Sequence, residues 1–175
     1  DRTNFFTNLY DHDIPAEGTP LREAMIAVGE YFKRTDDKGP WGLTPGSTGG
    51  TQHECRQNYN ILMTDGYWTE GSISGLDNSD NTAGSSIINH SSPASPASYS
   101  YAPALPYSDA YSDTLADVAM QYWKNDLRTD LQNKVPINPH DPAFWQHLVN
   151  FTVGLGVTGT LTELPSGAQS WPDPT

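Results

Sequence analysis

Apolar side chains recur at helical spacing early in the chain and predict a helix over residues 20–34. The positions that repeat at steps of three and four are Leu21, Ala24, Met25, Val28, Tyr31 and Phe32. Thr19 suits the N-cap, and Pro20 suits the first helical position because its missing N–H needs no partner there. We therefore expect an amphipathic helix whose apolar stripe faces a core.

A second helix is predicted within YSDTLADVAMQYWKNDLR, residues 111–128. Its apolar stripe comprises Leu115, Val118, Ala119 and Tyr122. Ser112 or Asp113 can cap its first turn, because short polar side chains accept hydrogen bonds from the unpaired backbone N–H groups there.

Two apolar runs predict strands. The run Ile61–Met63 lies in a predicted strand at residues 58–64, and a second strand is predicted at residues 147–155, where glycines end it. The first run does not alternate cleanly between apolar and polar residues. That pattern favours a parallel strand covered on both faces.

The order helix, strand, helix, strand predicts an α/β fold with a parallel sheet and flanking helices. We expect the 175 residues to form a single domain. Residues 1–18 are expected to be an irregular lead-in, with Phe5, Phe6, Leu9 and Tyr10 packing. Residues 66–110 are rich in Pro, Ser and Ala, and are interpreted as a low-complexity loop insertion.

Charge narrows the range of partners. The formal net charge is -12, which argues against nucleic acid and against an anionic membrane surface, since both require clustered Lys and Arg. No apolar run is long enough for direct membrane insertion. The single cysteine, Cys55, cannot form a disulfide within the chain.

The strongest candidate for chemistry is Asp65, which directly follows the first predicted strand. Gly66 allows a sharp turn there. Ligands of open α/β sheets bind at the carboxyl ends of the strands, and Thr19 is expected at the same edge. Carboxylate and hydroxyl oxygens suit Mg²⁺, Ca²⁺ or Mn²⁺. The alternative is that Thr19 only caps its helix and Asp65 only closes a turn, which is the commoner use of these residue types.

The segments GTPL at residues 18–21 and TDG at residues 64–66 resemble two of the three metal-site loops of von Willebrand factor A domains. The resemblance implies a Rossmann-like fold with a divalent cation at its carboxyl edge. It places Thr19 as a direct ligand and Asp65 as the aspartate of the third loop, which often acts through water. The metal of such domains takes its last ligand from a partner.

Longer segments are similar to the N-terminal region of PilY-type proteins, the tip-associated adhesins of bacterial type IV pili. They include GTPLREAM, CRQNYNILMTDGYW, YSDTLADVAMQYWKNDLR and DPAFWQHLVNFTVGLGVTGTL, and the similarity extends from about residue 5 to residue 162. This resemblance implies a non-enzymatic protein of the bacterial cell surface or pilus tip, exported through the periplasm. It also implies pilus tip proteins, minor pilins and host or surface ligands as partners.

One part of the metal-site pattern is missing. The first loop of such domains reads Asp-x-Ser-x-Ser after the central strand, whereas the nearest match, Asp77–Asn81, ends in Asn and follows no predicted strand. We interpret that segment as solvated loop, and expect the first loop and its strand before Asp1. We therefore expect the domain to be incomplete at its N-terminus, and expect this chain alone to bind a divalent cation weakly.

Two further functions stay open from the sequence. One is a structural scaffold without a functional metal site. The other is a hydrolase that uses Asp65, although no general base or nucleophile elbow is recognisable in the sequence.

Overall fold

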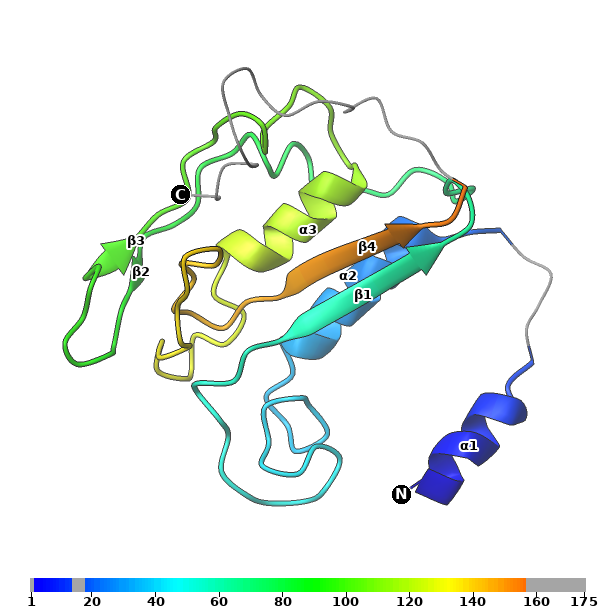
Figure 1. Cartoon of the computed structure of the whole chain (residues 1–175), viewed down its shortest axis with the longest axis horizontal. Helices are drawn as coiled ribbons and strands as arrows, with labels where there is room; N and C mark the ends of the chain where they lie inside the picture. The colour runs from blue at the N-terminus through cyan, green and yellow to red at the C-terminus, as the bar shows by residue number, and fades with distance from the viewer. Residues whose placement is uncertain (1, 14–17, 157–175) are drawn as a thin grey trace.

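The computed structural model describes residues 2–13 and 18–156 (Figure 1). The helices and strands in chain order are α1 (Arg2–Tyr10), α2 (Leu21–Phe32), β1 (Tyr59–Thr64), β2 (Ile87–Ile88), β3 (Ser98–Tyr99), α3 (Leu115–Lys124) and β4 (Val149–Gly154). In this part of the chain, no helix is long and apolar enough to cross a membrane.

The predicted α/β fold with a parallel sheet is confirmed in its main elements. β1 pairs with β4 in parallel, from Tyr59 opposite Val149 to Thr64 opposite Gly154. Helix α3 connects the two strands, as expected of a parallel crossover. The likeness to a von Willebrand factor A fold stays a prediction.

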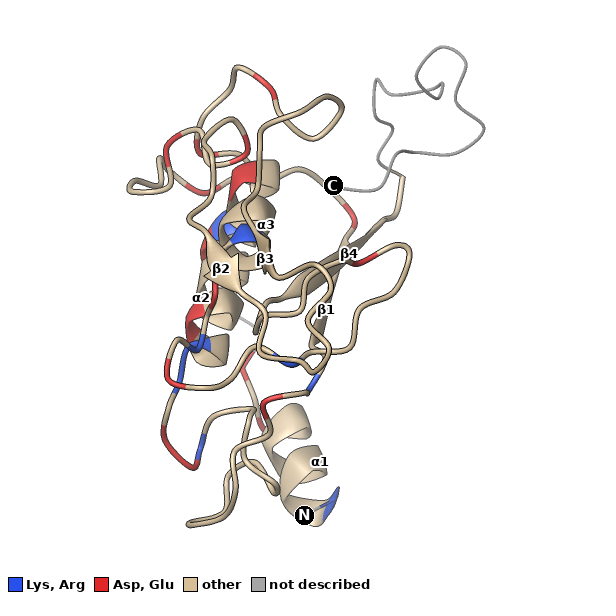
Figure 2. Ribbon diagram, turned by 90° about the vertical axis from the view of Figure 1, so that its left-hand side faces the viewer, with Lys and Arg blue, Asp and Glu red and all other residues tan. Residues whose placement is uncertain are grey.

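Helices α2 and α3 both cover one face of the β1–β4 pair (Figure 2). They approach closely because Gly29 of α2 has no side chain where it meets the ring of Tyr122. Around this contact lies a cluster of buried apolar residues: Met25, Val118, Tyr122, Leu127 and Leu148. A second cluster joins α3 to β2 and to the segment before β4; it contains Ile87, Tyr101, Met120, Trp123, Ala143, Phe144 and Trp145.

The opposite face of the sheet is exposed in the described part of the chain. It carries large apolar side chains, Tyr59, Ile61, Met63, Phe151 and Val153, which are between 41% and 65% exposed. The prediction that the first strand is covered on both faces is therefore wrong for Tyr59, Ile61 and Met63. The apolar run of β1 reflects one packed face and one bare apolar face.

The beginning of the chain also differs from expectation. Residues 2–10 form helix α1 and not an irregular lead-in. The helix has no buried residue, and Phe5, Leu9 and Tyr10, which were predicted to pack, are 61%, 55% and 77% exposed. Cys55, near β1, is a free and exposed thiol.

Part of the 66–110 segment packs against α3. It contains the β2–β3 hairpin, in which Ile87 pairs with Tyr99. Ser79 and Asp80 are buried, so interpreting Asp77–Asn81 as solvated loop is wrong at these two positions.

Helix α3 begins at Leu115, so its N-cap lies one residue after Asp113 and two residues after Ser112, the two predicted caps. Its N-cap is Thr114, whose hydroxyl accepts the backbone N–H of Asp117, while the Asp117 side chain accepts the backbone N–H of Thr114. This reciprocal capping box replaces the predicted role of Ser112 or Asp113.

Candidate functional site

Asp65 lies at the carboxyl end of β1, as the sequence predicts, and is exposed. Thr64, the residue before Asp65, holds the turn after the strand. Its hydroxyl donates to the carbonyl oxygen of Gly66 at 2.8 Å and accepts the Gly66 N–H at 3.2 Å. The turn therefore does not depend on the Asp65 carboxylate.

Thr19 is brought to the same end of β1, through Thr69. The Thr19 N–H donates to the Thr69 hydroxyl at 2.6 Å, and the Thr69 N–H donates to the Thr19 carbonyl at 3.2 Å. A side chain at Gly18 would not fit, because its Cβ would lie 2.4 Å from Oγ1 of Thr69. The backbone of Thr19 is thus held against Thr69, which lies four residues after Asp65 in the sequence.

The predicted N-cap role of Thr19 is wrong. The N-cap of α2 is Pro20, which provides no side-chain hydrogen bond. Instead, the Glu70 carboxylate accepts the backbone N–H groups of Arg22 and Glu23, at 2.8 and 3.1 Å. Glu70 follows no capping pattern in the sequence, because it lies 48 residues from Arg22.

Glu70 also forms an ion pair with the Arg22 side chain, whose Nε lies 2.7 Å from Oε1. Burial alone would raise the pKa of the Glu70 carboxyl. Hydrogen bonds from the Arg22 side chain and from the backbone N–H groups of Glu23 and Arg22 outweigh burial and hold that pKa below its usual value. Glu70 is therefore ionised at neutral pH and faces the positive end of the α2 dipole.

Arg22 joins three segments at this edge. Its guanidinium donates to the carbonyl oxygens of Gly71 and Asp113, both at 2.8 Å, and lies 5.1 Å from the ring centre of Trp68. Arg22 therefore holds the chain after β1, the start of α2 and the start of α3 together.

The donor set at this edge is small. Thr19 and Asp65 offer one hydroxyl and one carboxylate, whereas a hard cation takes about six oxygens from protein and water. Among residues 2–13 and 18–156, no group of three or more His, Cys, Asp or Glu residues is placed to hold a metal ion. These residues alone do not fit a complete metal site, and the metal-ligand role of Thr19 and Asp65 stays a prediction.

Comparison with known proteins identifies relatives among pilus proteins. No family model and no solved structure matches the chain. The type IV pilus biogenesis factor PilY1 of Pseudomonas aeruginosa strain PAK is 37% identical over 98% of this chain, and that of strain PAO1 is 36% identical over the same share. PilY1 of strain UCBPP-PA14 is 31% identical, also over 98% of the chain. The predicted resemblance to PilY-type proteins is confirmed.

The similarity covers only a part of these relatives. The chain spans 16% of the length of each of the three PilY1 proteins. What their names say of them, that they are pilus biogenesis factors, applies to the whole proteins.

Proposed function

Starting from the homology between this chain and a segment of the PilY1 type IV pilus biogenesis factors, we propose that the chain is a non-enzymatic module of a pilus-associated protein of the bacterial cell surface. It supports pilus biogenesis and adhesion. The observation that carries this proposal is the identity of 31–37% along 98% of the chain.

The proposed contact edge is the carboxyl end of β1. There, Asp65 is exposed and lies directly after the strand, and Thr19 is positioned nearby through Thr69. The N-terminus of α2 would repel a cation, but its positive end is compensated by the ionised Glu70. The charge of Asp65 is then available for a divalent cation, Mg²⁺ or alternatively Ca²⁺ or Mn²⁺, whose remaining ligands come from outside the described residues.

The proposed partners are pilus tip proteins or minor pilins, together with host or surface ligands. Tyr67, two residues after Asp65, offers contact area for such partners, since it is 67% exposed. In this proposal the protein is exported through the periplasm and acts at the cell surface or pilus tip.

Adhesion of piliated cells tests the proposal. The variant Asp65→Ala in the whole protein should weaken cation-dependent adhesion to the level seen with a chelator. The matched control is Asp11→Ala, which removes an exposed aspartate after α1, away from the sheet. Equal adhesion of Asp65→Ala and the parent protein, with and without chelator, would contradict the metal-edge role.

Titration calorimetry separates this proposal from its alternatives. Mg²⁺, Mn²⁺ and Ca²⁺ are titrated into this chain and into the whole protein, with Asp65→Ala as reference. Tight binding by the whole protein alone, lost in Asp65→Ala, supports a completed metal edge. Binding by neither supports a scaffold without a metal site. Turnover of generic esters or phosphate esters that Asp65→Ala abolishes would favour the hydrolase alternative.

A further inference from the structure

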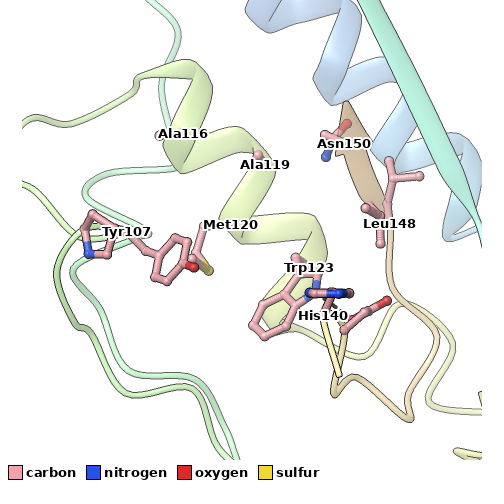
Figure 3. Close-up of a pocket in the computed structure, with 11 residues that line it drawn as sticks. Tyr107, Ala116, Ala119, Met120, Trp123, His140, Leu148 and Asn150 are labelled. Carbon is pink, nitrogen blue, oxygen red and sulfur yellow. Dashed lines mark hydrogen bonds between the residues drawn. The ribbon is translucent and has the colours of Figure 1, made fainter. Parts of the chain in front are cut away.

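The β2–β3 hairpin lies at one end of the domain, beside the segment that follows α3 (Figure 1). Its base is anchored in the core. There, Ile87 and Tyr99 belong to the apolar cluster around Met120 and Trp123, two side chains that project from α3 (Figure 3). The tip of the hairpin, residues 88–97, lies beyond this cluster and needs other contacts to hold it in place.

Asn133 fastens the hairpin tip to the segment after α3. The His90 N–H donates to the Asn133 carbonyl oxygen at 3.0 Å, and the Asn133 N–H donates to Nδ1 of the His90 ring at 2.9 Å. The side-chain amide of Asn133 adds a third hydrogen bond, to the carbonyl oxygen of Ile88 at 3.1 Å. One of the three bonds therefore depends on a side chain that can change its charge.

The bond from the Asn133 backbone fixes the protonation state of His90. A backbone N–H can only donate, so Nδ1 of His90 must accept and carries no proton. The ring is then neutral, with its proton on Nε2. A charged imidazolium has a proton on both nitrogens and cannot accept this bond. His90 is exposed to water, and histidine is the side chain whose charge ordinarily changes between about pH 5 and pH 8.

A cavity of about 390 Å³ lies beside His90, between the hairpin and the segment after α3. Asp126 and Asn133 line it together with His90. Asn133 is buried, and its Oδ1 accepts no hydrogen bond within the described part of the chain. The cavity thus offers a carboxylate and an orphaned amide oxygen, two acceptors for the N–H groups of a charged ring.

Asp126 lies within electrostatic reach of His90. Burial raises the pKa of the Asp126 carboxyl, and the charge of Asp130 raises it further. Hydrogen bonds from Arg128 and Asn133 lower that pKa, and so does the charge of a protonated His90. The attraction is mutual, so the Asp126 carboxylate favours an imidazolium at His90.

The other charged groups of this region already have partners. On the segment after α3, Arg128 pairs with Asp130 at 2.8 Å, and Lys134 pairs with Glu54 at 2.7 Å. Residues 85–99 of the hairpin contain no Lys, Arg, Asp or Glu. Asp126 is therefore the facing charge that a protonated His90 meets.

We propose that His90 and Asn133 form an acid-sensitive latch of the β2–β3 hairpin. While the His90 ring is neutral, Nδ1 accepts the Asn133 N–H and the hairpin tip is fastened. When the ring takes up a proton, the Asn133 N–H loses its acceptor. The ring then turns into the cavity and donates to the Asp126 carboxylate and to Oδ1 of Asn133. The tip is released, while the base stays anchored beside Trp123.

The direction of the effect follows from where the proton binds. The fastened state requires a neutral ring and the released state holds one more proton, so release is favoured as the pH falls. One proton taken up on opening changes the opening equilibrium by up to about tenfold for each pH unit. The latch uses no residue of the proposed metal edge and does not depend on that proposal.

Amide hydrogen exchange and ring nitrogen NMR of the chain test the latch. Between about pH 7.5 and about pH 5, the protection factor of the Asn133 amide should fall by roughly tenfold or more. The His90 ring should change over the same range from a single proton on Nε2 to protons on both nitrogens. The amide of Val135, which donates to the Phe144 carbonyl oxygen at 2.9 Å, should stay protected because the core remains folded.

Two pairs of variants separate the latch from a general effect of acid. His90→Asn places an amide oxygen where Nδ1 accepts and cannot be protonated, so protection of the Asn133 amide should no longer depend on pH. His12→Asn, at an exposed position after α1, should keep the pH dependence of the parent. Asp126→Asn removes the facing charge and should move release to lower pH by about 0.5 or more. Asp11→Asn, also exposed after α1, should not move it. Circular dichroism confirms that each variant is folded.

Several results would overturn the inference. The first is equal protection of the Asn133 amide at both ends of the pH range. The second is a His90→Asn variant that keeps the pH dependence of the parent, because another group would then be titrating. The third is loss of protection at Val135 together with Asn133, which would mean that acid unfolds the core and not the hairpin tip alone.

Discussion

Glu70 closes the amino end of α2 by accepting the backbone N–H of Arg22 at 2.8 Å while pairing with the side chain of the same residue at 2.7 Å. Both side chains are largely buried, at 3% and 11% exposed. One carboxylate therefore accepts the free backbone N–H groups at the start of α2 and also balances the charge of the buried Arg22 guanidinium. These contacts fix the chain after β1 to α2.

Removing Glu70 should lower stability strongly. Glu70→Ala leaves a buried guanidinium without its counter-charge and a helix end without its cap, so we expect a loss of about 2–4 kcal/mol in the free energy of unfolding. Urea unfolding measures it. The control is Glu54→Ala, which breaks the half-exposed pair with Lys134 and should cost less than about 1 kcal/mol. Equal losses in the two variants would contradict the role of Glu70.

The same carboxylate should make stability depend on pH. Folding lowers the pKa of Glu70, so its contribution is present above the pKa that it has in the unfolded chain, about 4.3, and is lost as pH falls through its folded-state value. Unfolding free energies measured from neutral pH into the acid range should converge for Glu70→Ala and the parent protein. A gap that stays constant with pH would show that the ionised carboxylate is not the cause.

Lys124 should anchor the buried part of the 66–110 segment. Its ammonium donates to the carbonyl oxygens of Ser79 and Thr82, at 2.7 and 2.8 Å. Lys124→Met keeps the apolar stem but leaves two carbonyls without their donor, which we expect to cost about 2–4 kcal/mol. Hydrogen exchange should quicken first around Thr82. Lys33→Met, at an exposed pair with Glu30, is the control and should change stability by less than about 1 kcal/mol.

Gly29 should resist substitution because of its packing. A Cβ at this position would lie 2.4 Å from the Tyr122 ring, so α2 and α3 could not keep their separation. Alanine gains about 1 kcal/mol of helix propensity but overpacks the contact, and Gly29→Ala should be less stable by about 1–2 kcal/mol in thermal unfolding. Gly66→Ala meets no atom within 4 Å and should stay within about 0.5 kcal/mol. A stabilised Gly29→Ala would refute the close packing.

The bare face of the sheet should tolerate polar substitution. Ile61 is 65% exposed, so Ile61→Thr should leave unfolding free energy within about 0.5 kcal/mol and reduce binding of a hydrophobic dye. Its neighbour Leu62 points to the other face and packs on the core, so Leu62→Thr should cost about 1.5–3 kcal/mol. Equal losses at both positions would mean that the face of Ile61 is covered in solution.

The sequence was sufficient for the elements that build the sheet. α2, β1, α3 and β4 were predicted within a few residues of their observed ends, and so was the parallel order. Helical periodicity, glycines and apolar runs are local signals, so they can be recognised without knowing what each segment packs against. The position of Asp65 at the end of a strand followed from the same signals.

The tertiary structure decided which groups meet. Glu70 caps a helix 48 residues away, and Lys124 binds a carbonyl 45 residues away; neither pairing has a pattern in the sequence. The missed helix α1 has Phe5, Phe6, Leu9 and Tyr10 at helical spacing, a local signal that the sequence did carry, although none of these residues is buried.

The sequence shows which residues of the strands are apolar, but it does not show which of them are buried by other elements. Ile61 and Phe151 belong to apolar runs that are typical of buried strands. They nevertheless lie on the exposed face of the sheet, because helices α2 and α3 both pack on the opposite face. A strand alternates between two faces whatever lies above them, so its sequence fixes which residues share a face. Only the placement of neighbouring elements in space determines whether that face is buried.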